Sequence, residues 1–160
     1  MKKIDETGLS LCRLQAEAFK KSVVITKCSS SIFIRRFMLS FVAERMDSGI
    51  IGEILDDTKI INEIKKQYGE SEYGKIKFAE EEMYWIGYIY RYFSYTHQKS
   101  SKQVYRIIKP DELRDLYFPY HSLDPAQAIE RILEAKQKTS DDMISEGIEI
   151  LRRIEKNKQK

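Results

Sequence analysis

The sequence predicts an all-α protein, a compact bundle of about six to eight helices joined by short connections. Three observations carry this prediction. Apolar residues recur at spacings of three and four along most of the chain. Ser, Asp and Pro stand where helices would begin, and no run of alternating residues predicts a strand. With 160 residues, 42% of them hydrophobic, the chain is long enough to bury a core without disulfides or a structural metal.

Three helical regions are expected before Gly69, covering about residues 8–22, 30–47 and 54–68. The second begins with a serine cap at Ser29, Ser30 or Ser31, because a serine oxygen accepts from the free amides of a first turn. It is expected to run as one helix to a stop at 47–49. The third is interrupted near residues 56–58, where Asp57 or Thr58 could cap its second piece.

Five helical segments are expected after residue 77. The strongest is Phe78–His97, which opens with three glutamates that suit the positive end of a helix dipole. The others are a short helix from Ser100–Ser101 to Ile108, one opened by Pro110, one opened by Asp124–Pro125, and a last one beginning at 140–142. Residues 119–122 are predicted to be a loop.

The stretch 69–77 holds two glycines and few apolar residues, which is typical of a boundary. It divides the chain into an N-terminal helical region (1–70) and a helical core (71–136), followed by a basic-ended helix (137–160). We expect these three regions to form one globular domain overall.

Composition excludes several classes of protein. Lys and Arg number 28 against 25 Asp and Glu, and an isoelectric point near 8.7 is too mild for a dedicated nucleic-acid binder. Cys12 and Cys28 form neither a disulfide framework nor, with the distant His97 and His121, a zinc site. No motif predicts a cofactor or metal. No leader or membrane-spanning stretch is recognised, so a cytoplasmic location is expected.

DNA binding is not expected through residues 101–118. The second half of that segment carries Asp111, Glu112 and Asp115 against Arg114 alone, a poor balance for facing phosphates. The last helix is the better candidate for DNA binding because it is rich in Lys and Arg. Glutamates are interspersed there, however, which favours a solvated surface helix.

Residues 78–97 hold eight of the 18 aromatic side chains. Tyr84, Tyr88, Tyr92 and Tyr95 share one helical face, and Trp85 lies on the adjoining one. A helix this apolar is normally central to a core, and the alternative is a tyrosine-rich face that binds a partner. Gly87 within this helix indicates that another backbone passes close by.

Arg91 lies among these aromatic residues and must be paired, stacked or bound to an anion if it is buried. With His97 it also resembles the R-x(4–6)-H motif of HEPN ribonucleases, in which an all-α dimer cuts RNA. A step of six residues turns about 240° around a helix, however, so the two side chains would lie on different faces. His121 is expected to be a loop histidine rather than a catalytic base.

Residues 68–134 carry a family resemblance. Four phrases stand out, namely YGxSxYGxIKF, MYWIGYIYRY, SSKQVYRIIKPDELRDLY and PYHSLDPAQAIERI. They resemble small Firmicute-type bacterial proteins labelled antitoxins of toxin–antitoxin pairs. Residues 101–132 also resemble a shorter family of unknown function that accompanies toxin genes.

The resemblance implies a binding protein that neutralises the toxin of a neighbouring gene by direct contact, without catalysis. Exposed aromatic and arginine side chains dominate such interfaces. The expected partner-binding residues are Tyr84, Trp85, Tyr88, Arg91, Tyr92, Tyr95, Tyr117, Tyr120 and His121. The alternatives are a HEPN-like ribonuclease using Arg91 and His97, or a scaffold or regulator without a toxin. No membrane partner is expected, and the sequence leaves the oligomeric state open.

Overall fold

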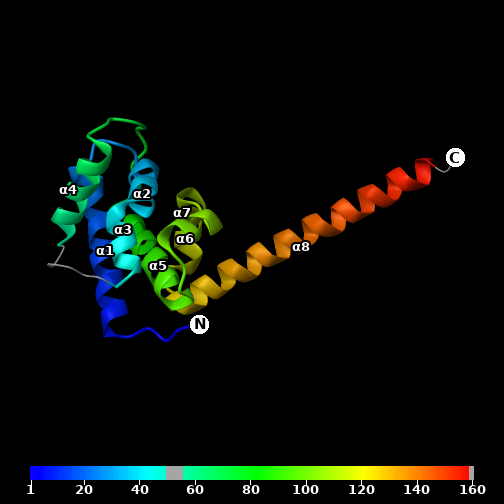
Figure 1. Ribbon diagram of the computed structural model, residues 1–160, viewed down its shortest axis with the longest axis horizontal. Coiled ribbons are helices and arrows are strands. Elements are labelled where there is room, and N and C mark those ends of the chain that lie inside the picture. Colours follow the sequence, from blue (N-terminus) through cyan, green and yellow to red (C-terminus); the bar gives the residue numbers. More distant parts are fainter. Residues whose placement is uncertain (50–55, 159–160) are drawn as a thin grey trace. The chain divides into compact units, whose positions relative to one another are not determined.

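A computed structural model describes residues 1–49 and 56–158, which form eight helices and no strand (Figure 1). The all-α prediction is confirmed. The helices are α1 (Glu6–Ile25), α2 (Ser30–Met38), α3 (Phe41–Asp47), α4 (Asp57–Tyr68), α5 (Glu80–His97), α6 (Ser101–Ile107), α7 (Pro110–Tyr120) and α8 (Pro125–Lys158). The chain divides into two units, Met1–Pro125 and Ala126–Lys160. Among the described residues, no helix is both long and apolar enough to cross a membrane.

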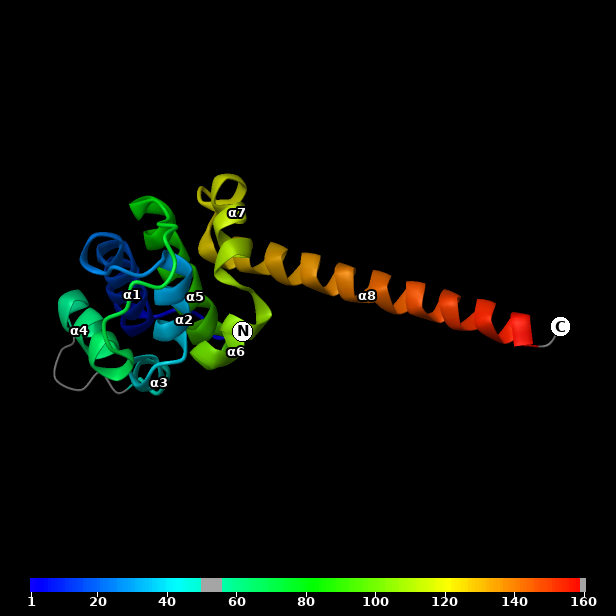
Figure 2. The same ribbon diagram turned by 90° about the horizontal axis from the view of Figure 1, so that it is seen from above.

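The first unit is built around α5. This helix packs along α1, and α6 and α7 contact it as well, while α4 lies against α1 (Figure 2). Apolar residues of α5 are buried around most of its circumference, including Met83, Ile86, Ile89 and Phe93. Such all-round burial is expected of a helix that neighbours surround. The aromatic-rich segment is therefore the central helix of the unit.

Helices α1 and α5 approach each other closely at Gly87. A Cβ atom there would lie 3.0 Å from the Cα atom of Ala16, 3.0 Å from the carbonyl oxygen of Gln15 and 2.9 Å from the ring of Phe19. Two of these atoms belong to the α1 backbone, which cannot move aside as a flexible side chain can. The close backbone approach predicted at Gly87 is confirmed.

Side-chain caps fix where several helices begin. The carboxylates of Asp5 and Asp56 and the hydroxyls of Ser29 and Ser100 accept hydrogen bonds from amides of the first turns they precede. Each bond satisfies an amide that has no partner within the helix. Cap placement agrees with the predicted starts of α2 and α6. The residues at 54 and 55, where the third helical region was expected to begin, lie outside the described residues.

The single helix predicted over residues 30–47 is wrong. It is two helices, α2 and α3, separated at Leu39–Ser40. The Ser40 hydroxyl donates to the carbonyl of Phe37 (2.7 Å) and accepts from the amide of Ala43 (3.1 Å). These local bonds replace the main-chain bonds of a continuous helix, which is how serine interrupts one.

Two predicted interruptions near the C-terminus are absent. Helix α7 continues through Pro119 and Tyr120, so only the end of the predicted loop 119–122 lies outside it. Helix α8 runs through 140–142 without a break for 34 residues. Around that point the polar side chains bond along the helix, with Gln137 donating to Asp141 (2.9 Å) and Thr139 to the carbonyl of Ala135 (2.9 Å).

The segment 69–77 is extended and connects α4 to α5. Its carbonyls at Tyr73 and Ile76 accept from the amides of Ser29 (2.8 Å) and Ser30 (3.0 Å). Gly74 has a φ of 73°, and a Cβ atom there would lie 2.6 Å from the Cβ of Ser29. The segment therefore links two helices of the same unit, and the division between the two units falls after Pro125.

We expect Gly87→Ala to destabilise the protein although alanine is the better helix former. The alanine gains about 1 kcal/mol of helix propensity. Forcing α1 away from α5 costs about 1–3 kcal/mol, as overpacking does in other cores. Urea unfolding followed by circular dichroism measures the difference. An increase in the free energy of unfolding would contradict the close backbone contact.

Candidate functional site

The surface of the first unit carries an open groove between α5 and α7, which we call the aromatic groove. Its volume is about 560 Å³. Aromatic side chains make up most of its wall, and Lys20 and Glu81 are its charged members. The full lining is Lys20, Glu81, Tyr84, Trp85, Tyr88, Tyr117, His121, Leu123 and Pro125. An apolar wall with few polar groups is typical of a binding site.

Ring contacts hold the walls of the groove in place. Along α5, the ring centroids of Tyr84 and Tyr88 lie 6.5 Å apart and those of Tyr88 and Tyr92 lie 6.3 Å apart, both pairs stacked. Residues four apart face the same way on a helix, which places the three rings in a row. Trp85 meets Tyr117 of α7 edge to face at 5.9 Å. The two helices therefore present their aromatic residues in a fixed arrangement.

The far wall of the groove depends on the end of α7. The ring of His121 stacks on that of Tyr117 with centroids 4.6 Å apart. Its Nδ1 lies 2.8 Å from the carbonyl oxygen of Tyr117, so this nitrogen carries the proton in that contact. His121 thus packs on Tyr117 and forms the C-cap of α7.

Burial raises the pKa of Tyr88, and it raises the pKa of Tyr92 in the same way. Both phenols are consequently protonated at neutral pH. A protonated tyrosine offers a ring face and a hydroxyl donor, which suits protein contacts better than a buried phenolate would.

The structure brings together five of the nine residues that the sequence singles out for partner binding. Those in the groove are Tyr84, Trp85, Tyr88, Tyr117 and His121. Tyr92 lies beside them at the end of the tyrosine row and is 8% exposed. Tyr120 occupies the last turn of α7 outside the groove lining.

Tyr95 belongs to a different part of the surface. Its hydroxyl donates to the carboxylate of Asp5 (2.7 Å), and the ammonium of Lys2 lies 4.2 Å from its ring centroid. It also covers Gly8 in the first turns of α1. The hydrogen bond from the Gly8 amide, together with the smaller effect of that from Tyr95, lowers the pKa of Asp5. Tyr95 therefore fixes the start of α1 and does not line the groove.

Sequence reasoning did not include four of the groove residues. Glu81 precedes Tyr84 and Trp85 by about one helical turn, so the helical period of α5 could have indicated it. Lys20 comes from α1, and no local pattern connects it to this surface. The other two, Leu123 and Pro125, follow α7 directly in the chain.

Arg91 lies in the interior and not on the aromatic groove. Its side chain is 1% exposed, and three of its nitrogens donate to other side chains. The acceptors are the carboxylate of Asp47 (2.6 Å), the amide oxygen of Gln15 (2.8 Å) and the hydroxyl of Ser101 (3.1 Å). Burial lowers the pKa of Arg91, and the carboxylate opposes that shift. Structural pairing is thus the role that the contacts of Arg91 indicate.

Asp47 binds this arginine from the end of α3. Its Oδ1 also accepts from the hydroxyls of Ser101 (2.7 Å) and Ser94 (3.2 Å), and its Oδ2 accepts from the amide of Ser101 (2.8 Å). A buried charge needs such full hydrogen bonding to offset the loss of water. The network joins α1, α3, α5 and α6 through polar contacts.

His97 has surroundings unlike those of Arg91. Its ring meets the ring of Phe93 edge to face at 4.8 Å, and its Nδ1 lies 3.1 Å from the hydroxyl of Thr96. Partial burial, with smaller effects of the N-terminus and Lys99, lowers its pKa. Within one chain, therefore, Arg91 is engaged in the interior while His97 packs against Phe93 of its own helix.

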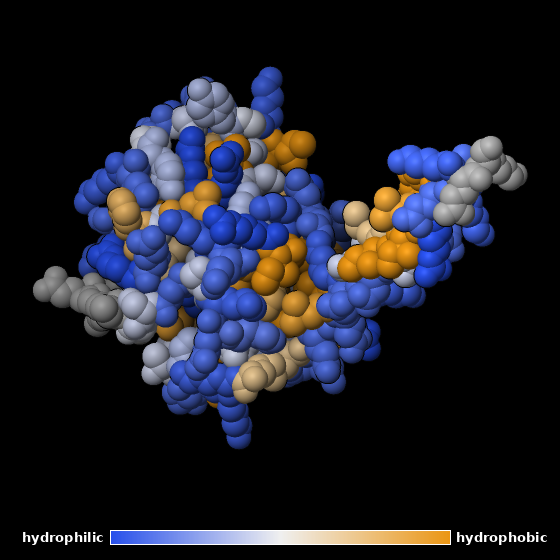
Figure 3. All heavy atoms as spheres, turned by 45° about the vertical axis from the view of Figure 1, so that its right-hand side comes forward, coloured by the Kyte–Doolittle hydropathy of each residue, from blue (hydrophilic) through white to orange (hydrophobic). Residues whose placement is uncertain are grey.

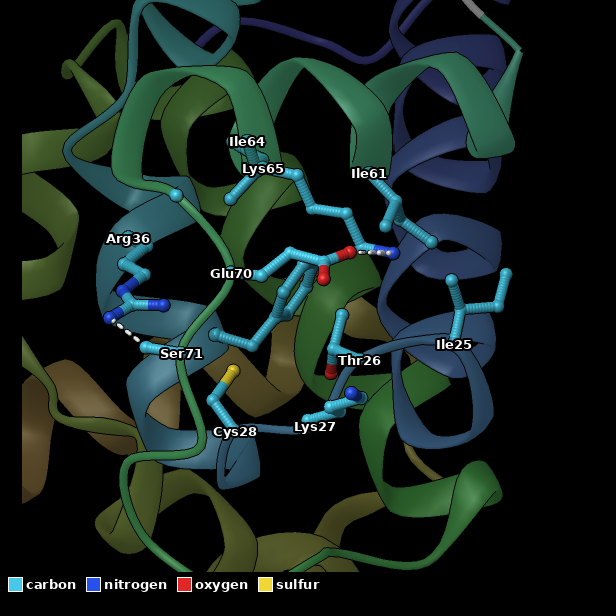
Figure 4. A pocket seen from close by; sticks show the side chains of 12 residues that line it. Ile25, Thr26, Lys27, Cys28, Arg36, Ile61, Ile64, Lys65, Glu70 and Ser71 are labelled. Atoms are coloured by element: carbon cyan, nitrogen blue, oxygen red, sulfur yellow. Dashed lines mark hydrogen bonds and ion pairs between the residues drawn. The ribbon is translucent and has the colours of Figure 1, made fainter.

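The two cysteines are buried thiols. Cys28 lies at a small cavity of about 50 Å³ between α2 and α4, with Ile25, Ile61 and Ile64 around it (Figure 4). That volume holds about one or two water molecules and no larger ligand. Burial raises the pKa of Cys12 to about 12, so its thiol stays protonated and unreactive at neutral pH.

Comparisons of the chain with protein-family models, curated proteins and solved structures find no match. Across residues 1–49 and 56–158, no three His, Cys, Asp or Glu side chains gather as metal ligands would. The apolar and aromatic lining of the aromatic groove is typical of a binding site.

We expect the network around Arg91 to show strong coupling between its charges. Asp47→Ala leaves a buried arginine without its carboxylate and should cost about 3–5 kcal/mol. The double variant Asp47→Ala/Arg91→Met removes both charges and should be less destabilised than the sum of the single variants. The double-mutant cycle is measured by urea unfolding of the unmodified protein, the two single variants and the double variant. Simple additivity would contradict the buried ion pair.

Because of His97, the free energy of unfolding should also decrease as the pH drops below about 6.5, the ordinary pKa of histidine. In the folded protein the pKa of His97 is lower than in the unfolded chain. As the pH falls, the unfolded chain therefore binds the proton first, and protonation stabilises the unfolded state relative to the folded state. The contribution of His97 is thus complete above about pH 6.5 and is lost as the pH falls through the folded pKa. His97→Phe should make the stability less dependent on pH in this window, measured by urea unfolding at several pH values. An unchanged dependence would contradict the burial of His97.

Proposed function

We propose that this protein is an antitoxin-like binding protein that neutralises a cognate toxin by direct contact through the aromatic groove. The observation that carries the proposal is the gathering of Tyr84, Trp85, Tyr88 and Tyr117 around one open apolar groove. The resemblance of residues 68–134 to antitoxins agrees with it, because those residues contribute most of this wall.

The chemistry of the groove supports a protein partner. Tyr and Trp are the residue types that contribute most to binding energy at protein interfaces. Their rings are held by mutual contacts, so little side-chain freedom is left to lose on binding. The faces of the rings attract cations, and the apolar wall accepts aliphatic side chains. A toxin segment that inserts an apolar side chain next to a Lys or Arg fits this surface.

Lys20 and Glu81 give the groove one charge of each sign. Charged groups at the edge of an interface influence orientation and association rate more than affinity. The pair therefore favours one direction of the inserted segment over the reverse. The affinity itself would come from the aromatic wall.

We expect Tyr88→Ala to abolish the rescue of growth when the protein is co-expressed with the toxin of the neighbouring gene. Tyr84→Ala should weaken rescue in the same way, and binding of the purified toxin should fall at least tenfold, the loss typical of a hot-spot residue. Isothermal titration calorimetry measures that change. The matched control is Tyr73→Ala, since Tyr73 is 70% exposed and lies outside the groove.

Arg91→Ala is unsuitable for this test because it would disturb the interior. Circular dichroism of each tyrosine variant should show an unchanged fold. If both variants fold normally and still rescue growth, the groove is not the toxin-binding surface. If the product of the neighbouring gene does not bind at all, the antitoxin proposal itself is wrong.

A further inference from the structure

Helix α8 carries a broad apolar face over its C-terminal half. Six large side chains there are between 45% and 68% exposed. At 100° per residue, they occupy one arc of about 160° around the helix. They are Met143, Ile144, Ile148, Ile150, Leu151 and Ile154. In Figure 3 apolar side chains gather along one side of this part of the helix. Soluble proteins rarely expose such a continuous face without a binding partner.

Gly147 lies in the middle of this face. Glycine within a helix costs about 1 kcal/mol relative to alanine. A Cβ atom at Gly147 would meet nothing within 4 Å, so no contact within the described residues requires a glycine at this position. Small residues on a helix surface allow another helix to approach closely. Gly147 therefore leaves room for the backbone of a further helix to approach this face.

The charge on this part of α8 is divided along its length. Residues 139–151 carry four acids and no base, whereas 152–158 carry four bases and one acid. The basic end suits the helix dipole, but that effect is confined to the last turn. Two such helices placed antiparallel would set the acidic half of each beside the basic half of the other. The helix is thus complementary to a reversed copy of itself.

The apolar positions fit the same reversal. When Ile144 is placed opposite Ile154 of a second copy, Gly147 falls opposite Leu151, a small residue against a large one. Along the helix axes, Asp142 and Glu146 of one copy then come level with Lys156 and Arg152 of the other. At one edge of the contact Ile148 lies next to Ile148 of the second chain, and at the other edge Ile150 lies next to Ile150 of the second chain. This explains why the apolar face is wider than the seam of a two-stranded coiled coil.

We propose that the face from Met143 to Ile154 pairs two copies of this chain through antiparallel α8 helices. The surface is separate from the aromatic groove, and the proposal does not rest on the antitoxin function. A contact of three to four turns is short, so the dimer should dissociate on dilution through the micromolar range. Each dimer would carry two aromatic grooves.

Sedimentation equilibrium of the full chain tests the self-association. Gly147→Leu should raise the dimer dissociation constant at least tenfold because the leucine collides with Leu151 of the second copy. It should also increase helix content, since leucine is the better helix former. The matched control is Ser145→Leu, which adds the same side chain away from the apolar face and should leave the dissociation constant unchanged.

Disulfide trapping tests the orientation. Ile144→Cys chains mixed with Ile154→Cys chains should form a cross-linked pair, and Cys12 and Cys28 are buried and should stay silent. Ile144→Cys alone should not cross-link, because its two copies would lie about 15 Å apart along an antiparallel pair. A disulfide needs the two Cα atoms within about 7 Å.

Each result decides the proposal. Cross-linking of Ile144→Cys with itself would show parallel helices and overturn the antiparallel register. A chain that remains monomeric at every concentration would leave the face to a different protein and would overturn pairing between copies. Equal effects of Gly147→Leu and Ser145→Leu would show that Gly147 has no part in the contact.

Discussion

The close crossing of α1 and α5 at Gly87 is the constraint on which the first unit depends. Because the two backbones are in contact there, the side chain of Gln15 reaches α5 and makes two hydrogen bonds with it. Its amide nitrogen donates to the carbonyl of Gly87 (3.1 Å), and its amide oxygen accepts from Arg91 (2.8 Å). A wider crossing would leave these buried groups without partners, at a cost of about 1–3 kcal/mol each.

The same crossing also positions elements that pack on other sides of α5. Arg91 extends from α5 to Asp47 at the end of α3, and Asp47 in turn binds the first residue of α6. On another side of α5, Trp85 holds α7 through Tyr117. The aromatic groove is thus a consequence of how the core fixes α5. Its shape should be insensitive to substitutions on the exposed surface and sensitive to those near Gly87.

Pairing through α8 would change how the aromatic groove works. Two grooves in one assembly bind a two-fold symmetric partner more tightly than either groove alone, because the second contact forms at a high effective concentration. A monomeric partner would gain nothing from this arrangement. The proposed self-association would therefore bear on whether a protein that binds the groove is itself an oligomer.

The sequence by itself determined the helical class, most helix starts and the close contact at Gly87. These depend on residues near one another in the chain, such as the Ser100 cap and the spacing of apolar positions. Five of the residues that it singled out lie in the groove, and two of them, Tyr84 and Tyr88, share a helix face because they are one turn apart. The break at Ser40 and the unbroken α8 were missed, since serine and aspartate can either end a helix or bond along it. Only the tertiary structure assigned Asp47 as the partner of Arg91 and brought Lys20 to the groove. Those contacts join residues tens of positions apart, and no local pattern records which distant side chain a buried charge will meet.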